Sequence, residues 1–258
     1  MSPDLHSRCD LLRSLHQPGA PLLLPNAWDV ATARAVVAAG FPVVATTSGG
    51  VAGALGHEDH EQAPGDEMLA AAARIARGVE APVTVDAEAG YGMEPAELVA
   101  ALRAAEAAGC NLEDTDYAAG GGLRDADQHA EWLGAVRQAA SEDGYGLVIN
   151  ARIDVFLGPL LGGAGPETQE ELVPEAVRRA QAYFEAGVDC VYPLVLFETG
   201  ALRRFMAEVD GPVNIVRMPP APSVAELAEL GVARVSWGHF LYQDAIARFG
   251  EELRALQV

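Results

Sequence analysis

The sequence has few cysteines and no long apolar run, and each absence excludes a class of protein. Its three cysteines, Cys9, Cys110 and Cys190, are far apart and lack the spacing of a metal or redox motif. We therefore expect a protein of the reducing cytoplasm. No run of ~18 apolar residues occurs, and residues 1–10 contain no basic stretch followed by an apolar one. This predicts neither a membrane span nor a signal peptide.

Basic residues are also scarce, because 17 of them stand against 37 acidic residues and the formal net charge is −20. A surface of this sign repels nucleic acid and anionic lipid, so we expect neither as a partner. Half of the residues are hydrophobic and no low-complexity segment occurs. The composition is that of a folded domain rather than a disordered or fibrous chain.

Helical patterns alternate with short apolar runs along the chain. Four helical patterns end in a glycine, the residue that commonly follows the last turn of a helix: Gly40, Gly109, Gly187 and Gly231. A β-type run follows each of these glycines at once. The expected strands are residues 21–26, 42–47, 82–87, 110–114, 146–152, 190–195, 212–217 and 233–237.

Eight apolar strands that alternate with helices predict an α/β fold, a (β/α)8 TIM-type barrel that forms a single domain over residues 1–258. The alternative is an open doubly wound sheet, but that fold needs a phosphate-type glycine fingerprint after an early strand, and none occurs. Residues 1–20 are expected to form a helix and a turn, and residues 239–256 a final helix.

Polar side chains follow the strands, where a barrel of this type places its working residues. Three carboxylates from neighbouring strands, those of Asp86, Glu88 and Glu113, would repel one another, so the cluster predicts a bound cation. An all-oxygen ligand set favours Mg²⁺ or Mn²⁺ over zinc. The alternative is that Asp86 and Glu113 cap helices or pair with arginines. The other polar residues at strand ends are Asn26, Thr47, Ser48, Asp114, Asn150, Arg152, Asp154, Asn214 and Arg217.

Two further features could hold an anionic substrate. The stretch "TTSGG", residues 46–50, is expected to be a flexible turn whose hydroxyl and N–H groups bind a carboxylate or an oxyanion; alternatively, it is an ordinary glycine-rich turn. Arg152 closes a buried strand and must find a negative partner. A substrate carboxylate and an internal salt bridge are equally good candidates for that partner.

Together these stretches resemble the isocitrate lyase and phosphoenolpyruvate mutase superfamily. The resemblance rests on "LPNAWD" (residues 24–29), "SGGVAGALGHED" (48–59), "VDAEAGYG" (85–92), "NLED" (111–114), "NARID" (150–154) and "PVNI" (212–215). It implies a (β/α)8 enzyme that stabilises the Mg²⁺-bound enolate of a 2-oxo acid such as pyruvate. It also implies that Asp86 binds Mg²⁺ directly, with Mn²⁺ as a possible substitute, while Asp59, Glu88 and Glu113 hold the water shell of the ion.

The resemblance also assigns the substrate site. It implies that Ser48, Gly49 and Gly50 grip the carboxylate and the enolate oxygen, and that Arg152 and Asn214 contact the rest of the substrate. The full set of expected substrate-binding residues is Thr47, Ser48, Gly49, Gly50, Asp86, Arg152 and Asn214, and the expected catalytic residues are Asp59, Arg152 and Tyr117.

The sequence departs from the lyases of this superfamily on the loop after the fourth strand. Residues 115–125 read "TDYAAGGGLRD" and lack the Lys-Cys-Gly-His motif whose thiol serves as general acid or base. Leu194 stands where those lyases carry an acidic residue. The glycines at 120–122 suit a hinged lid. The proton donor is therefore left open among Tyr117, His57, His60 and His239, although for each histidine an exposed or helix-capping position is the favoured interpretation.

The expected activity is a Mg²⁺-dependent C–C lyase acting on a small dicarboxylate or tricarboxylate of the 2-methylisocitrate or isocitrate type, with release of a 2-oxo acid. The alternatives are an oxaloacetate-type decarboxylase, a C–P bond mutase or hydrolase, and a non-catalytic 2-oxo-acid-binding protein. The resemblance further implies a homotetramer, a dimer of dimers in which the final helix, residues 240–256, packs on a neighbouring subunit. Its apolar residues would serve equally well against its own barrel.

Overall fold

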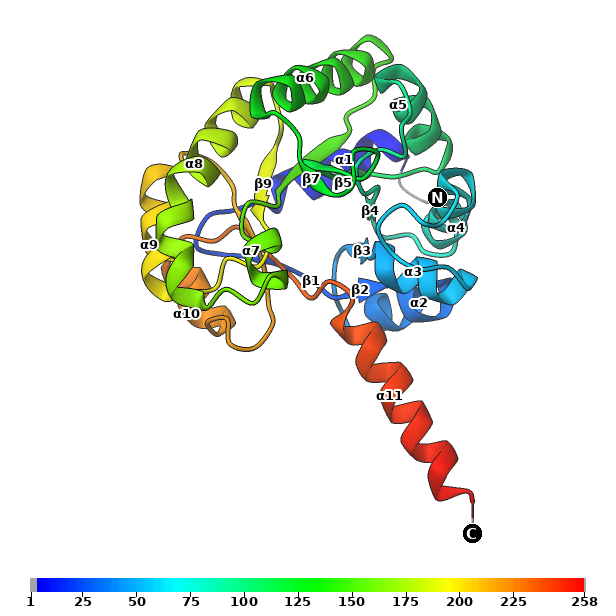
Figure 1. Ribbon diagram of the computed structural model, residues 1–258. Helices are drawn as coiled ribbons and strands as arrows, with labels where there is room; N and C mark the ends of the chain where they lie inside the picture. The colour runs from blue at the N-terminus through cyan, green and yellow to red at the C-terminus, as the bar shows by residue number, and fades with distance from the viewer. Residues whose placement is uncertain (1–3, 258) are drawn as a thin grey trace.

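Parallel strands form the centre of the molecule, and each of the eight expected runs overlaps one (Figure 1). The computed structural model describes residues 4–257, and the element bounds below refer to that range. The parallel strands are β1 Leu22–Leu24 with its continuation β2 Asn26–Ala27, β3 Val44–Thr46, β4 Val83–Asp86, β5 Gly109–Glu113, β8 Val148–Ile153, β9 Cys190–Pro193, β10 Asn214–Val216 and β11 Arg234–Ser236.

The ring of strands is completed by a first strand that is divided in two. β1 pairs with β11, which pairs with β10, whereas β2 pairs with β3 at the start of the order β2-β3-β4-β5-β8-β9. Pro25 separates β1 from β2, because proline has no N–H to donate to a neighbouring strand. A parallel bridge between Val191 and Val213 joins β9 to β10. The expected parallel barrel is confirmed.

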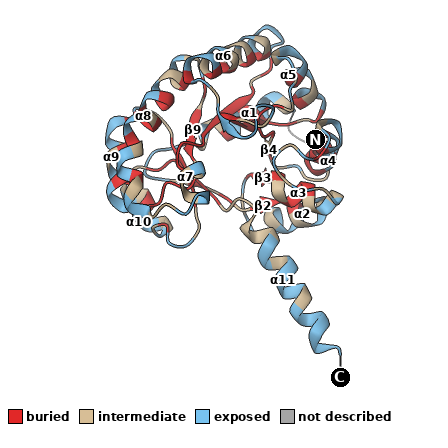
Figure 2. Cartoon of the chain, viewed as in Figure 1, coloured by how far each residue is buried: buried red, intermediate tan, exposed pale blue. Residues whose placement is uncertain are grey.

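The helices, most of which surround the strands, turn their exposed sides outward (Figures 1 and 2). They are α1 Leu5–Ser14, α2 Val30–Ala38, α3 Ser48–Leu55, α4 Gly65–Arg77, α5 Pro95–Ala104, α6 Ala126–Glu142, α7 Leu157–Leu161, α8 Gln169–Glu185, α9 Thr199–Glu208, α10 Val224–Glu229 and α11 Phe240–Ala255, with the 3₁₀ turn η1 Pro166–Thr168 before α8. In the described part of the chain, none of these helices has the length and apolar character needed to cross a membrane.

Three of the four expected helix-ending glycines are confirmed, and one is wrong. Gly40, Gly187 and Gly231 have left-handed φ values of 91°, 92° and 85°. After α5, however, the left-handed residue is Glu106 (φ 59°). Gly109 instead begins β5, where an added Cβ would lie 2.7 Å from both the Leu12 side chain and the Val148 carbonyl oxygen. This glycine therefore lets α1 pack closely over the start of the strand.

The segment expected as a lid, residues 115–125, contains a short antiparallel hairpin that the sequence pattern did not predict. Its strands are β6 Thr115–Asp116 and β7 Gly122–Leu123. Gly120 and Gly121 have φ values of 94° and 91° and form the turn between them. Strands of two residues are too short to produce a recognisable alternation of polar and apolar positions.

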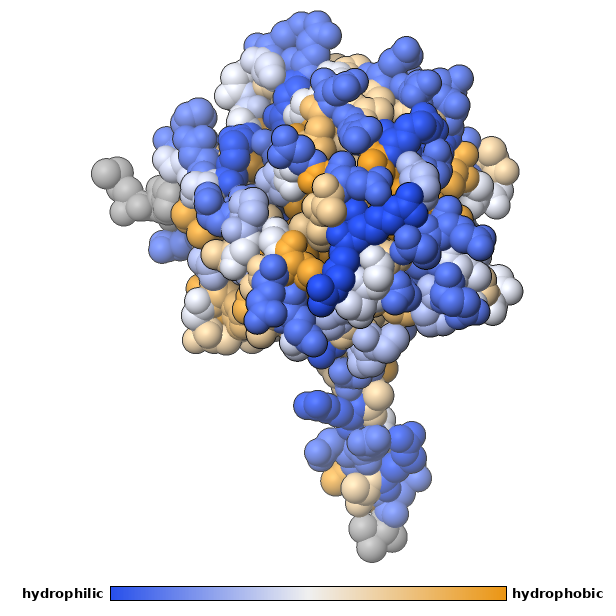
Figure 3. All heavy atoms as spheres, turned by 90° about the vertical axis from the view of Figure 1, so that its left-hand side faces the viewer, coloured by the Kyte–Doolittle hydropathy of each residue, from blue (hydrophilic) through white to orange (hydrophobic). Residues whose placement is uncertain are grey.

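The last helix, α11, projects from the barrel as a stalk (Figures 1 and 2). Beyond the first turn of the helix the large apolar residues are exposed: Ile246 by 53%, Phe249 by 62%, Leu253 by 46% and, directly after the helix, Leu256 by 77%. Figure 3 shows apolar and polar residues side by side on this stalk. The alternative that the helix packs along its own barrel is wrong, because its axis leads away from the barrel.

A histidine on the buried side of α6 gives a prediction about acid stability. His129 is 1% exposed, and neither ring nitrogen has a hydrogen-bond partner. Its ring packs against those of Trp132 and Tyr183, with centroid distances of 5.5 and 5.3 Å. Burial, together with nearby Arg124 and Arg179, lowers its pKa to about 3. The folded protein therefore keeps this ring neutral, whereas the unfolded chain takes up the proton near pH 6.5.

We expect His129→Phe to make the protein more resistant to acid. Stability that depends on the neutral ring is complete above about pH 6.5 and falls by about 1.4 kcal/mol per pH unit toward pH 3. The variant should gain about 1 kcal/mol near neutral pH, because it removes two unsatisfied nitrogens. That gain should grow by about 2 kcal/mol at about pH 5, measured by urea unfolding. Parallel pH profiles for the two proteins would contradict this account.

Candidate metal and substrate site

A cavity of about 160 Å³ lies at the carboxyl ends of the barrel strands, and we call it the central cavity. Asp86 and Ser236, which end β4 and β11, both contribute to its wall. Its polar lining comes from strands and loops that are far apart in sequence: Asn26, Thr47, Ser48, Asp59, His60, Asp86, Asn111, Arg152, Tyr192, Ser236 and His239. This end of the barrel is where enzymes of this architecture carry out their chemistry.

Asp86 is fixed on the cavity wall by backbone contacts. Its Oδ2 accepts a hydrogen bond of 2.9 Å from the Ser48 N–H, and its own N–H donates to Thr46 Oγ1 at 2.8 Å. Its other oxygen, Oδ1, is buried without a partner. Burial raises the pKa of Asp86, while Arg152 and the Ser48 N–H oppose this rise. One oxygen thus remains available for a ligand that carries positive charge.

The stretch at residues 46–50 is a helix start rather than the expected flexible turn. Thr47 precedes the first residue of α3, so Ser48, Gly49 and Gly50 form its first turn. Their N–H groups have no carbonyl partner within the helix, and the positive end of the helix dipole adds to them. An added Cβ at Gly49 would lie 2.7 Å from Asp59 Oδ2. The glycine therefore allows a carboxylate to approach the helix.

Asp59 is the second acid on the cavity wall. It comes from the loop between α3 and α4, and its Oδ1 is buried without a hydrogen-bond partner. The following residues, His60 and Glu61, have left-handed φ values of 67° and 54°. A left-handed backbone conformation is unfavourable for residues other than glycine, so surrounding contacts must hold this loop in place.

Contacts to the loop after β4 provide that support. The Glu61 N–H donates to Glu88 Oε2 at 2.6 Å, and Glu61 Oε1 accepts from the Tyr91 N–H at 2.7 Å. Glu88 is 1% exposed, and burial raises its pKa to about 8, with the charges of Asp86 and Asp59 acting in the same direction. Glu88 does not line the central cavity. It connects the two loops that carry the cavity acids.

Glu113 ends β5 and is held by protein partners. It forms an ion pair with Arg152 and accepts a hydrogen bond from the Tyr117 hydroxyl. The alternative that this acid pairs with an arginine therefore holds. Burial raises the pKa of Glu113, and Arg152 opposes the rise. Like Glu88, it does not line the central cavity.

Arg152 has internal partners, so the salt-bridge alternative describes it correctly. Its Nε and Nη2 donate to the two oxygens of Asp154 at 2.6 and 2.8 Å, and its Nη1 pairs with Glu113. The guanidinium still forms part of the cavity wall. It presents a charge that two carboxylates already neutralise.

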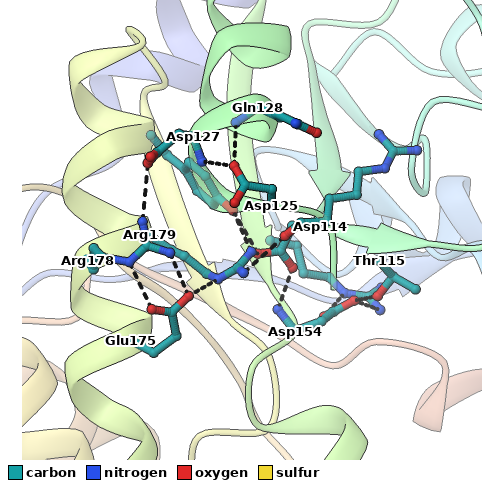
Figure 4. A network of polar contacts seen from close by, with 12 residues as sticks. Asp114, Thr115, Asp125, Asp127, Gln128, Asp154, Glu175, Arg178 and Arg179 are labelled. Carbon is teal, nitrogen blue, oxygen red and sulfur yellow. Dashed lines mark hydrogen bonds and ion pairs between the residues drawn. The ribbon is translucent and has the colours of Figure 1, made fainter. Parts of the chain in front are cut away.

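A buried network extends from Asp154, the partner of Arg152, to α8 (Figure 4). Asp154 accepts from Thr115 Oγ1 at 2.5 Å, and its N–H donates to Asp114 Oδ1 at 2.8 Å. Arg179 Nη1 donates to Asp114 Oδ2 at 2.8 Å, and its Nη2 donates to the Arg124 carbonyl at 3.0 Å. Arg179 thereby contacts the chain at both ends of the lid segment, at Asp114 and at Arg124.

Sequence reasoning missed Arg179. A signal existed, because Glu175, Arg179 and Tyr183 follow one another at intervals of four, and Arg179 and Tyr183 lie on the buried side of α8.

The remaining candidates are divided between the cavity and its surroundings. His60 and His239 line the central cavity, and burial lowers the pKa of His239. His57 instead lies 3.3 Å from Glu67. Asn214 is fully buried, donates to Ser236 Oγ at 3.3 Å and lies outside the cavity lining, as does Arg217.

No thiol replaces the missing lid cysteine. Cys9, Cys110 and Cys190 are all buried and free. Burial raises the pKa of Cys9 to about 11 and the pKa values of Cys110 and Cys190 to about 12. Such cysteines stay protonated and unreactive at neutral pH.

The acids of the central cavity fit a magnesium ion that is bound by few protein ligands. Within residues 4–257, no three His, Cys, Asp or Glu side chains are grouped closely enough to enclose a metal. Asp86 and Asp59 nevertheless both line this cavity, and each has one buried oxygen without a hydrogen-bond partner. Mg²⁺ commonly takes one or two carboxylates and keeps several waters, which matches this pair.

The geometry describes a (β/α)8 barrel with an acid pair and a helix N-terminus at the carboxyl ends of its strands. The chain belongs to the phosphoenolpyruvate phosphomutase family, whose model matches residues 12–257. The resemblance to the isocitrate lyase and phosphoenolpyruvate mutase superfamily is thereby confirmed, and proteins named 2-methylisocitrate lyase are among its relatives. Members of this superfamily are lyases and mutases.

Three similar proteins cover nearly the whole chain. A crystal structure of a candidate phosphonomutase from Burkholderia cenocepacia J2315 is 39% identical, with a TM-score of 0.88 over 96% of this chain and 99% of that one. The uncharacterized protein Rv1998c of Mycobacterium tuberculosis is 33% identical over 94% of this chain and 87% of its own length. An oxaloacetate decarboxylase of Chromohalobacter salexigens is 29% identical over 95% and 84%.

Proposed function

We propose that the protein is a Mg²⁺-dependent carbon–carbon lyase that decarboxylates a small 2-oxo diacid of the oxaloacetate type. The observation that carries this proposal is the uneven lining of the central cavity. At the ends of β3 and β4 the lining presents Asp86, Asp59 and Ser48 of the first turn of α3. At the ends of β8 to β11, across the ring of strands, it presents Arg152 and Tyr192 together with the apolar residues Leu157, Leu194, Val195, Val216, Met218 and Phe240. The substrate would be bound at its 2-oxo end by the polar side.

The polar side can bind a 2-oxo carboxylate and stabilise developing charge. Mg²⁺ held by Asp86, with Asp59 beside it, would supply positive charge at the 2-oxo end, with Glu88 and Glu113 further out. The N–H groups of Gly49 and Gly50, in the first turn of α3, would donate to the substrate oxygens. The first turn of α3 is held in place before any substrate enters, because the Ser48 N–H donates to Asp86 at the end of β4.

The apolar side favours loss of the second carboxylate. An anion against Leu194, Val195 and Met218 loses hydration that these apolar side chains do not replace, whereas neutral CO₂ loses much less. As the C3–C4 bond breaks, its electron pair forms the C2–C3 double bond of the enolate and CO₂ leaves. A proton then adds to C3 and yields the 2-oxo acid product.

The charge of Arg152 argues against a tricarboxylate. Its guanidinium is paired with Asp154 and Glu113, so it offers little attraction to a further carboxylate. A 2-methylisocitrate-type lyase remains the second candidate, favoured by the relatives of that name. An amine-dependent route through an imine is excluded, because the sequence contains no lysine.

We expect Tyr117→Phe to lower the rate of product formation. Burial raises the pKa of Tyr117, and its hydroxyl lies against Glu113, so the phenol keeps its proton across the working pH range. If Tyr117 supplies the proton to C3, kcat should fall by roughly 10²-fold with little change in KM. Unchanged kcat would instead point to His60, His239 or water as the donor.

The proposed activity can be tested by supplying Mg²⁺ and oxaloacetate and measuring pyruvate by coupled reduction. We expect turnover that chelation of the metal abolishes. Parallel incubations with 2-methylisocitrate and with a phosphonopyruvate distinguish the lyase and C–P alternatives. Tight binding of 2-oxo acids without turnover of any candidate would identify a non-catalytic binding protein.

We also propose that α11 packs on a neighbouring subunit in a homotetramer. Ile246, Phe249 and Leu253 recur at helical spacing and are exposed in the single chain. Replacing both Phe249 and Leu253 by serine should shift the mass measured by light scattering toward smaller species. Glu252→Gln on the same helix serves as the control. A monomeric wild-type protein would exclude this arrangement.

A further inference from the structure

A second cavity of about 300 Å³ lies between the lid hairpin and α7, and we call it the lid cavity. It shares His60 and Leu157 with the central cavity, so the two spaces adjoin. Figure 1 shows β7 and α7 on the same side of the barrel. The apolar lining consists of Leu123, Val155, Leu157, Pro159 and Leu161.

The polar groups of the lid cavity already have protein partners. Thr115 donates to Asp154 at 2.5 Å, and both oxygens of Asp154 accept from Arg152. The Tyr117 hydroxyl donates to Glu113. No arginine lines this cavity in the described chain, and His60 is its one ionisable group without an assigned partner. The cavity is therefore unsuited to a carboxylate, which would lose its hydration without gaining a cation.

We propose that the lid cavity binds an alkyl group carried on C3 of the substrate, so that the preferred substrate is a 3-alkyl-2-oxo diacid. This inference rests on the proposed function and extends it. The reacting end of the substrate occupies the central cavity, and the alkyl group passes Leu157 into the adjoining space. Unsubstituted oxaloacetate leaves that space unfilled.

Two exposed leucines support an apolar occupant. Leu161 is 74% exposed and Leu123 is 43% exposed, and both border the lid cavity from opposite elements. An alkyl group between the hairpin and α7 removes part of this apolar surface from water. Each buried CH₂ group contributes about 0.8 kcal/mol, which is about fourfold in affinity.

The first experiment compares oxaloacetate with its 3-methyl, 3-ethyl and 3-propyl derivatives. In the wild-type protein with Mg²⁺, kcat/KM is expected to rise by about fourfold with each added carbon. Gly158→Leu fills the lid cavity, because Gly158 lines it and an added Cβ would meet nothing within 4 Å. This variant should lose the preference for alkyl groups and keep its rate with oxaloacetate within about twofold.

A matched control is available on α6. Gly134→Leu makes the same substitution where an added Cβ would meet only Ala186, at 3.8 Å. It should retain the wild-type alkyl preference. An equal preference of wild type and Gly158→Leu for every derivative would overturn the inference, as would a wild-type preference for unsubstituted oxaloacetate.

A binding measurement separates failure of this inference from failure of the proposed function. Calorimetric titration with pyruvate, 2-oxobutyrate and 2-oxopentanoate, in the presence of Mg²⁺, requires no turnover. Affinity that rises along this series in the wild type, but not in Gly158→Leu, supports the lid cavity even if no substrate is decarboxylated. Affinity that falls along the series in the wild type refutes it even if oxaloacetate is turned over.

Discussion

Asp86→Asn is expected to abolish measurable Mg²⁺ binding and to lower kcat by roughly 10³-fold, the upper range for loss of a charge-stabilising group. The carboxylate has one oxygen on the Ser48 N–H and one buried oxygen without a partner. The asparagine side chain can still accept the hydrogen bond from the Ser48 N–H through its carbonyl oxygen. It cannot carry the negative charge that a divalent cation requires.

The same substitution should not weaken the fold. Burial raises the pKa of Asp86, so the charged form is disfavoured in the folded protein without a cation. The metal-free variant should therefore unfold at a temperature equal to or above that of the wild type. Asp66→Asn, at an exposed position in the first turn of α4, is the control for loss of a carboxylate. Undiminished Mg²⁺ affinity in Asp86→Asn would exclude the proposed metal site.

Arg179→Met is expected to destabilise the protein by about 3–5 kcal/mol, because it leaves a buried carboxylate without its cation. Asp114 is fully buried and accepts hydrogen bonds from Arg179 and Tyr183 at 2.8 and 2.7 Å. The substitution also removes the contact from Arg179 to the Arg124 carbonyl at the end of the lid segment. Urea unfolding at neutral pH measures the loss.

The neighbouring arginine provides a matched control. Arg178 pairs with Glu175 and Asp127 at 2.9 and 3.2 Å, but its side chain is 48% exposed (Figure 4). Arg178→Met should cost at most about 1 kcal/mol, because water screens the pair. Equal losses in the two variants would show that burial does not set the strength of these ion pairs. Adding Asp114→Asn to Arg179→Met should recover part of the loss.

Most of the barrel could be predicted because buried parallel strands are apolar on both faces. The runs around Val44, Val85 and Ile149 therefore stood out from the helices between them. Gly109 shows where this reasoning failed. Its position after a helical pattern indicated a helix cap, but a glycine is needed there because Leu12, far away in sequence, lies too close for a Cβ. A spacing rule contains no information about such a contact.

At the site, the positions of Asp86, Glu113 and Arg152 at strand ends were predictable, since the register of a parallel barrel brings those ends together. Their partners were not. Glu113 and Arg152 neutralise each other, and Glu88 is held by Glu61, which leaves Asp86 and Asp59 with unpartnered oxygens in the central cavity. Pairing depends on distances of a few ångströms between segments that the chain order does not constrain.

The amino-acid order alone was enough for the barrel and for the acids at its mouth, because apolar runs and strand ends are local features. The folded chain was needed to show that α3 begins at Ser48, that Arg152 already has its counter-charges, and that a lid cavity adjoins the central one. These properties arise from packing between elements, where contact energies depend on geometry that no single segment contains.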